Sequence, residues 1–213
     1  MESNKYLTLA RQARAEGNTE DAKNYYNKVR EENPENGEAK FFYAYYALYE
    51  GTNGEIPQRY GNLCKVLPTA IELVKNSGAE LEAQLETISQ IANTFIPEAW
   101  SLNRYMNKKN RETKVGDSYV KVFESSAIVS CITKGMFGIR DLGDQIEKLY
   151  PENEAAKALS VAAWKEYVTL AQKWYAYPPK GEAETYAEKI KKIDPSYEMP
   201  KKAGCISFSD KRD

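Results

Sequence analysis

Apolar residues recur three or four positions apart along most of the chain, the spacing of one face of an α-helix. The opening stretch, residues 6–34, shows the pattern clearly. Gly17-Asn18 separates two apolar faces, Thr19 is placed to cap the second helix, and Pro34 stops it. We therefore predict a pair of helices over 4–16 and 19–32, with these inward positions: Tyr6, Leu9, Ala10, Ala13, Ala22, Tyr26 and Val29.

The same pattern returns near the C-terminus. Residues 164–195 repeat it with these positions: Tyr167, Leu170, Ala171, Trp174, Ala183, Ala187, Ile190 and Pro195. A partial copy occupies 37–68. In it Gly51 lies 34 residues after Gly17, and Pro68 lies 34 residues after Pro34. Three repeat-like helical hairpins are thus predicted, at 4–34, 37–68 and 164–195.

The middle of the chain, residues 69–163, also has helical periodicity and is predicted to be a helical insert. Asn76-Ser77-Gly78 should break it, Pro97 should kink or end a helix, and Gly135 and Gly138 should interrupt another. Residues 52–62 hold two glycines and a proline, which predicts an irregular approach to the second helix of the hairpin 37–68.

No run alternates between apolar and polar residues for long enough to predict a strand. The expected fold is therefore all-α, an antiparallel array of helical hairpins with about eight to ten helices in a single domain, residues 1–195. Residues 196–213 have a weak pattern and are predicted to form a loose tail.

These hairpin positions resemble the tetratricopeptide repeat (TPR) family, whose two short helices carry bulky, small and aliphatic residues at fixed places and close on proline. The hairpins 4–34 and 164–195 fit this pattern, 37–68 fits in part, and 70–165 does not match. The resemblance implies a TPR-like α-solenoid. It also implies a scaffold whose concave face holds a peptide segment of a partner protein.

The chain as a whole is also similar to a group of uncharacterised bacterial proteins with a zinc ribbon followed by a TPR-like helical region. Their helical region opens with a phrase like residues 6–26. No CxxC motif occurs in the present chain, so it contains no such ribbon. The similarity implies no activity.

One function of the TPR family is testable on single residues. Repeats that grip the C-terminal carboxylate of chaperones use Lys and Asn, four apart, on the first helix and Asn on the third. The matching positions hold Leu7, Arg11 and Tyr45. A chaperone clamp of this kind is therefore not expected.

Charge and hydropathy exclude some partners. Acidic and basic residues nearly cancel, 31 against 30, so no overall charge favours nucleic acid or an anionic membrane. The basic run 104–114 is interpreted as a solvated helix end. No apolar run approaches about 20 residues, so no membrane span is predicted.

Residue types narrow the chemistry further. Histidine is absent, which removes His-based triads and His metal sites. The cysteines, Cys64, Cys131 and Cys205, are sparse and lack metal or redox spacing, which fits a reducing, cytoplasmic compartment. The segment GMFG at 135–138 is not a phosphate loop. We expect no cofactor, no metal site and no enzymatic activity.

The aromatic run 41–49, FFYAYYALY, is the best candidate for a functional surface. Helical spacing divides it between packing positions and the inner, concave face, where two arginines of the first helix would join it. Rigid aromatics beside arginines suit an extended peptide. The candidate partner-binding residues are Arg11, Arg14, Phe41, Tyr45 and Tyr49. The competing interpretation is that these aromatics fill space left by residues 52–62.

Two other functions remain open. A small-molecule or lipid sensor would have a deep apolar pocket among residues 79–134. An enzyme of unknown type would have converging buried carboxylates or lysines in a cleft. A homodimer is a further possibility, because exposed aromatic faces of helical arrays often pair.

Overall fold

The computed structural model describes residues 2–52, 55–112, 123–173 and 179–201, and the regular elements in these ranges are all helical. They are α1 (Glu2–Ala15), α2 (Thr19–Glu32), α3 (Gly37–Tyr46), a short 3-10 helix η1 (Ala47–Tyr49), α4 (Ile56–Lys75), α5 (Leu81–Glu112), α6 (Phe123–Leu149), α7 (Glu154–Lys173) and α8 (Glu182–Ile193). Within the described residues the all-α prediction is confirmed.

Some predicted residues fall outside this description. They are Trp174, Cys205, the side chain of Cys131 and most side chains of the basic run 104–114.

Local signals set the turn between α1 and α2. Gly17 has φ +74°, a left-handed conformation that glycine adopts without strain, and this ends α1. The side chain of Asn18 accepts a hydrogen bond from the backbone N–H of Asp21, 3.2 Å away. Asn18 is therefore the N-cap of α2, and the prediction that Thr19 caps it is wrong by one residue.

Two prolines, one at the predicted end of the hairpin 37–68 and one predicted to kink or end a helix, lie inside long helices. Pro68 lies within α4 and Pro97 within α5, so neither ends its helix. Buried residues before and after each proline, such as Leu67 and Ala70 in α4, share one apolar face, and their packing outweighs the lost backbone hydrogen bond. The irregular stretch at 52–62 is also shorter than predicted, because α4 already begins at Ile56.

The predicted glycine breaks are wrong for a different reason. Gly135 and Gly138 lie inside α6, where they make room for large side chains of other helices. A Cβ atom at Gly138 would stand 2.7 Å from Cζ of Phe95, and one at Gly135 would overlap the hydroxyl of Tyr60. These glycines serve close helix packing, not helix termination.

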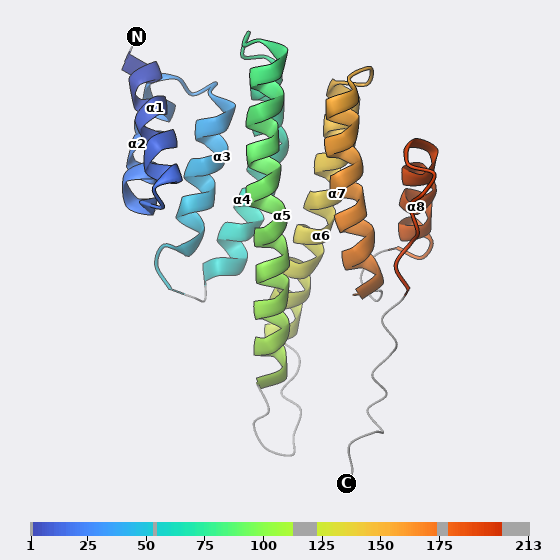
Figure 1. Cartoon of the computed structure of the whole chain (residues 1–213). Helices are drawn as coiled ribbons and strands as arrows, with labels where there is room; N and C mark the ends of the chain where they lie inside the picture. Colours follow the sequence, from blue (N-terminus) through green and yellow to red (C-terminus); the bar gives the residue numbers. More distant parts are fainter. Residues whose placement is uncertain (1, 53–54, 113–122, 174–178, 202–213) are drawn as a thin grey trace.

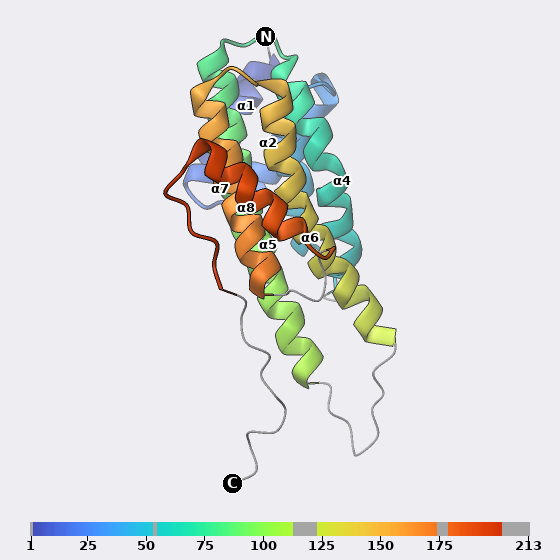
Figure 2. The same cartoon turned by 90° about the vertical axis from the view of Figure 1, so that its right-hand side faces the viewer.

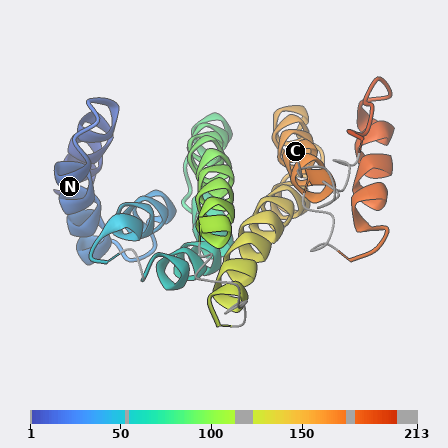
Figure 3. The same cartoon turned by 90° about the horizontal axis from the view of Figure 1, so that it is seen from below.

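The helices form a two-layered antiparallel array (Figure 1). Within it α4 packs on α6, and α5 packs on α7. Figure 3, seen along the helices, places α3 set back between α1 and α5. Figure 2 shows α6 crossing obliquely behind α8. This arrangement makes α3 the floor, and α1 and α5 the walls, of one face of the molecule.

The core is one continuous cluster. Buried apolar residues run without a break from Ala10 in α1 to Ile190 in α8. The largest fully buried side chains include Tyr26, Tyr60 and Trp164. The predicted boundary at residue 164 falls in the middle of α7, so that helix spans both the insert and the last predicted hairpin.

The first residues of the predicted loose tail pack on the array. Tyr197 and Met199 are half-buried against the core, and the Nε2 of Gln172 lies 3.9 Å from Sδ of Met199. At the end of α8, Asp194 forms an ion pair with Lys165 at 2.7 Å. The described residues 196–201 thus run back along the helices (Figure 1), and residues from 202 onward lie outside the description.

Candidate functional site

The five predicted binding residues lie along the face formed by α1, α3 and α5. Arg11 and Arg14 come from α1, Phe41 and Tyr45 from α3, and Tyr49 from η1. The side chains of α1 and α5 meet across α3, because Nη2 of Arg14 donates to Oε1 of Gln90 at 2.5 Å. We call this surface the α1–α3–α5 face.

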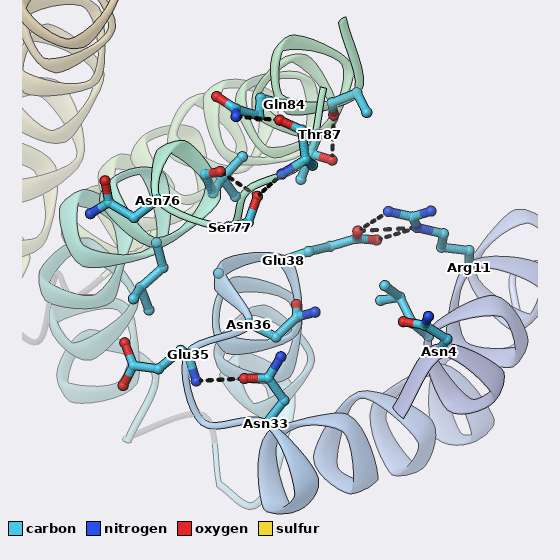
Figure 4. A pocket seen from close by; sticks show the side chains of 16 residues that line it. Asn4, Arg11, Asn33, Glu35, Asn36, Glu38, Asn76, Ser77, Gln84 and Thr87 are labelled. Atoms are coloured by element: carbon cyan, nitrogen blue, oxygen red, sulfur yellow. Dashed lines mark hydrogen bonds and ion pairs between the residues drawn. The ribbon is translucent and has the colours of Figure 1, made fainter. Parts of the chain in front are cut away.

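A hollow of about 550 Å³ opens at the end of this face where α3 and α5 begin (Figure 4). Its volume falls in the range of small-ligand sites, about 300–1,000 Å³. Amide, hydroxyl and small apolar side chains make up most of its lining: Asn4, Leu7, Arg11, Asn33, Glu35, Asn36, Gly37, Glu38, Leu73, Val74, Asn76, Ser77, Ala79, Ala83, Gln84 and Thr87.

A buried carboxylate, Glu38, is the centre of the polar contacts at the hollow. It is 3% exposed and follows the N-cap of α3. Nε of Arg11 donates to both of its oxygens at 3.0 Å, and Nη2 donates to Oε2 at 2.5 Å. The hydroxyl of Tyr26 donates to Oε1 at 3.0 Å, and Nη1 of Arg14 lies 3.8 Å from the same oxygen.

These contacts set the charge states around Glu38. The hydrogen bond to Glu38 raises the pKa of Arg11, so the guanidinium stays charged. Burial raises the pKa of Tyr26 far above its ordinary value, and the Glu38 charge raises it further, so the phenol stays protonated. Because the Arg11 side chain is 49% exposed while Glu38 is buried, the ion pair holds a fixed cation at the open wall of the hollow.

Several amide groups at the hollow are available to a ligand. Among the described residues, the side chains of Asn4 and Asn76 have no hydrogen-bond partner, and Asn36 uses only its Oδ1, as the cap of α3. Gln84 differs, because Nε2 donates to a backbone carbonyl and Oε1 accepts from the hydroxyl of Tyr150 at 2.8 Å. Both polar groups of the Gln84 side chain are thus used within the protein, while the amides of Asn4 and Asn76 offer donors and acceptors to a ligand.

The aromatic run packs in two ways. Phe41 is fully buried and stacks under Tyr45, with ring centroids 6.4 Å apart. Phe42 is also buried and carries the guanidinium of Arg14, 4.1 Å above its ring. The burial of Phe41 and Phe42 agrees with the interpretation that the aromatics fill space left by residues 52–62. Tyr43, Tyr45 and Tyr46 are half-buried, and Tyr49 is the exposed aromatic of the run.

Farther along the face, Tyr49 joins α5 through a carboxylate. Its ring is 55% exposed, while its hydroxyl donates a hydrogen bond to Oε1 of Glu98, a residue only 9% exposed. Burial raises the pKa of Glu98, although the bond from Tyr49 opposes this rise. Burial also raises the pKa of the Tyr49 hydroxyl well above its usual range.

The structure therefore brings the predicted residues together only in pairs. Arg11 and Arg14 meet at Glu38, and Phe41 stacks with Tyr45. Of the five, Arg11 alone lines the hollow, and Tyr49 lies farther along, at Glu98.

The sequence prediction missed Glu38, Glu98 and the α5 wall of the hollow. A usable signal existed for Glu38, which stands directly before Ala39, Phe41 and Phe42 on an apolar helix face, where an acidic residue needs a partner. No such signal marked Thr87 or Ala83, because their place in the hollow depends on how α5 packs beside α3.

Other polar clusters hold helices together. At the far end of the array, Asp144 accepts hydrogen bonds from Nε1 of Trp164 and from the hydroxyl of Tyr186. Within the described residues, no group of three or more carboxylates and cysteines is placed to hold a metal ion. No helix in that part of the chain is long and apolar enough to cross a membrane.

Comparison with known proteins yields no match: no family model, no curated protein sequence and no solved structure corresponds to this chain. The function is therefore argued from the geometry of the α1–α3–α5 face.

Proposed function

We propose that the protein is a non-enzymatic interaction module that holds an extended peptide segment of a partner protein on the α1–α3–α5 face, with one residue of that segment in the hollow. The observation that carries this proposal is the Arg11–Glu38 pair. A guanidinium fixed by a buried carboxylate stands at the wall of an open hollow of about 550 Å³.

The polar groups around the hollow match the needs of a peptide backbone. An extended backbone presents N–H donors and C=O acceptors in alternation, and an amide side chain serves either. Asn4, Asn36 and Asn76 hold such groups, and Arg11 keeps N–H donors free of Glu38. Because Glu38 holds the Arg11 guanidinium in place, this donor is ordered before binding, which lowers the entropic cost.

A TPR-like solenoid is part of this proposal. Ala10 and Ala22 in the first hairpin, and Ala171 and Ala183 in the last, occupy the small-residue positions of the family and are buried. Their small size supports the close helix contacts of a TPR hairpin. A cytoplasmic location is also proposed, on the sparse cysteine content.

Blocking the hollow tests the function. Ala83 is an exposed residue in the first turn of α5 and lines the hollow, so Ala83→Trp fills it without removing any side-chain bond. Ala155 is a matched control, an exposed alanine in the first turn of α7 and outside the hollow. A random peptide display library selected on the wild-type protein supplies the probe.

We expect the enriched peptides to bind wild type and Ala155→Trp equally, and Ala83→Trp at least about tenfold more weakly, a loss of ~1.4 kcal/mol. Equal binding to all three proteins, or no enrichment over an empty surface, contradicts the proposal. Circular dichroism of the variants establishes that each is folded.

The second candidate is a small-molecule binding domain. The volume of the hollow favours it, and four lining residues (Ala79, Ala83, Gln84 and Thr87) belong to the range 79–134, although the pocket expected there was deep and apolar and this hollow is open and largely polar. Native mass spectrometry of the purified protein distinguishes the two, since a copurified ligand that is absent from Ala83→Trp supports the sensor and not the peptide module.

A further inference from the structure

The buried carboxylate of Glu98 lacks a counter-ion. Its one hydrogen bond within the described residues comes from the Tyr49 hydroxyl, and no Lys or Arg of that part of the chain pairs with it. Glu38, the comparable buried acid on the same face, has two guanidinium groups beside it. A buried charge without an opposite charge is unfavourable, so Glu98 is primed to accept a cation from outside.

Two tyrosines, Tyr49 and Tyr45, interact with the Glu98 carboxylate. Tyr49 is the most exposed large aromatic on the face. The pKa of Tyr45 is raised mainly by burial and then by the negative charge of Glu98, so Tyr45 lies near that carboxylate. A guanidinium or ammonium group is attracted both to a carboxylate and to the faces of aromatic rings. Tyr45 and Tyr49 therefore add to the attraction that Glu98 exerts.

We propose that Glu98, Tyr45 and Tyr49 form a subsite for the side chain of an arginine or lysine in the bound peptide. This assignment rests on the peptide-binding function proposed above and specifies the chemistry of the partner. Charge complementarity selects the occupant: the subsite offers an anion and π-faces, while the hollow offers a cation, Arg11.

The spacing of the two subsites fits one extended peptide. Glu38 and Tyr49 are eleven residues apart along α3 and η1, and Thr87 and Glu98 are also eleven residues apart along α5. Eleven helical residues rise about 16–17 Å, and an extended peptide covers that distance in about five residues. The basic residue is therefore expected about five positions from the residue that occupies the hollow.

A small probe tests the subsite without a known partner. N-acetyl-arginine amide is titrated into the full-length protein and followed by NMR signals of Tyr45, Tyr49 and the Glu98 carboxyl carbon. N-acetyl-citrulline amide, which has nearly the same shape and no charge, is the matched probe. We expect saturable shifts at these three residues with the arginine probe. The citrulline probe should bind at least about fivefold more weakly.

Two variants separate this subsite from general attraction to acidic surface. Glu98→Gln keeps the shape and the acceptor for Tyr49 but removes the charge. Glu166→Gln is the control, because Glu166, half-buried on α7, also accepts a hydrogen bond from an aromatic side chain, Nε1 of Trp100. The preference for arginine should disappear in Glu98→Gln and persist in Glu166→Gln. Equal affinity for both probes, shifts elsewhere only, or an undiminished preference in Glu98→Gln overturns the assignment.

The peptide library separates failure of the subsite from failure of the peptide function. One outcome is that the selected peptides lose binding to Ala83→Trp, contain no basic residue and bind Glu98→Gln as they bind wild type. This result supports the peptide-binding function and refutes the cation subsite. Peptides that need a basic residue and Glu98, yet bind Ala83→Trp normally, support the subsite and refute the role of the hollow.

Discussion

Removal of Arg11 should leave a buried carboxylate without its main partner. In Arg11→Met, Glu38 keeps only the Tyr26 hydroxyl at 3.0 Å and the Arg14 guanidinium at 3.8 Å. Breaking a fully buried ion pair costs about 3–5 kcal/mol. Because the Arg11 side chain is 49% exposed and water reaches part of the pair, we expect a smaller loss, about 2–3 kcal/mol of unfolding free energy.

The double-mutant cycle tests whether this cost belongs to the pair. Glu38→Gln removes the charge but keeps an acceptor, and Arg11 is then free to turn to water, so its cost should be about 1–2 kcal/mol. The combined variant Arg11→Met/Glu38→Gln should be less destabilised than the sum of the single variants, by about 1–2 kcal/mol.

Urea unfolding at neutral pH, followed by far-UV circular dichroism, measures all four proteins. Gln12→Met is the matched control, an exposed neighbour of Arg11 on α1, and should change the stability by less than about 0.5 kcal/mol. If Arg11→Met is no more destabilising than Gln12→Met, or if the single effects simply add, the Arg11–Glu38 pair does not order the wall of the hollow.

Three further predictions concern packing and ionisation. Gly138→Ala should destabilise by about 1–3 kcal/mol in urea unfolding, because its Cβ would stand 2.7 Å from Phe95, and Gly138→Ala/Phe95→Leu should recover part of the loss; no recovery would argue against that clash. Burial raises the pKa of Glu98, so the folded state loses stability as pH rises from the unfolded pKa through the folded one. Glu98→Gln should therefore melt at a higher temperature than wild type near neutral pH, with the gap closing in acid, and a lower melting temperature at neutral pH would contradict the assigned cause. Burial raises the pKa of Tyr150 to about 12 from an ordinary value of about 10, so the stability that the protonated Tyr150 contributes is lost as pH rises between these values. Over that pH interval Tyr150→Phe should lose less unfolding free energy than wild type, by up to about 2 kcal/mol. Equal losses in the two proteins would disprove this assignment.

Helix positions were largely predictable because helical periodicity is a local property. Residues 182–193 were predicted as a helix and form α8 over the same range, and Gly17 ends α1 through its own backbone conformation. The errors cluster where a neighbouring helix decides the outcome. Pro97 and Gly138 carry strong local signals for a break, yet burial of Phe95 between α5 and α6 keeps both helices continuous.

The candidate site was predictable only on the side of α1 and α3. Arg11 and Arg14 lie one turn apart on α1, and the aromatic run lies within α3 and η1, so helical spacing grouped the residues of each helix and the resemblance to a TPR hairpin placed the two groups on one face. Whether each side chain would be open or buried did not follow from that spacing: Phe41 has no exposed surface, while Tyr49 keeps more than half of its own.

The sequence by itself determined an all-α chain and the turns between most helices, because these depend on residues a few positions apart. Only the tertiary structure decided that a hollow exists, that Glu38 fixes Arg11 at its wall, and that Glu98 is buried with no cationic partner among the described residues. The physical reason is distance along the chain. Arg11, Glu38 and Thr87 come from three helices, α1, α3 and α5, and only the packing of the whole array brings them to one hollow.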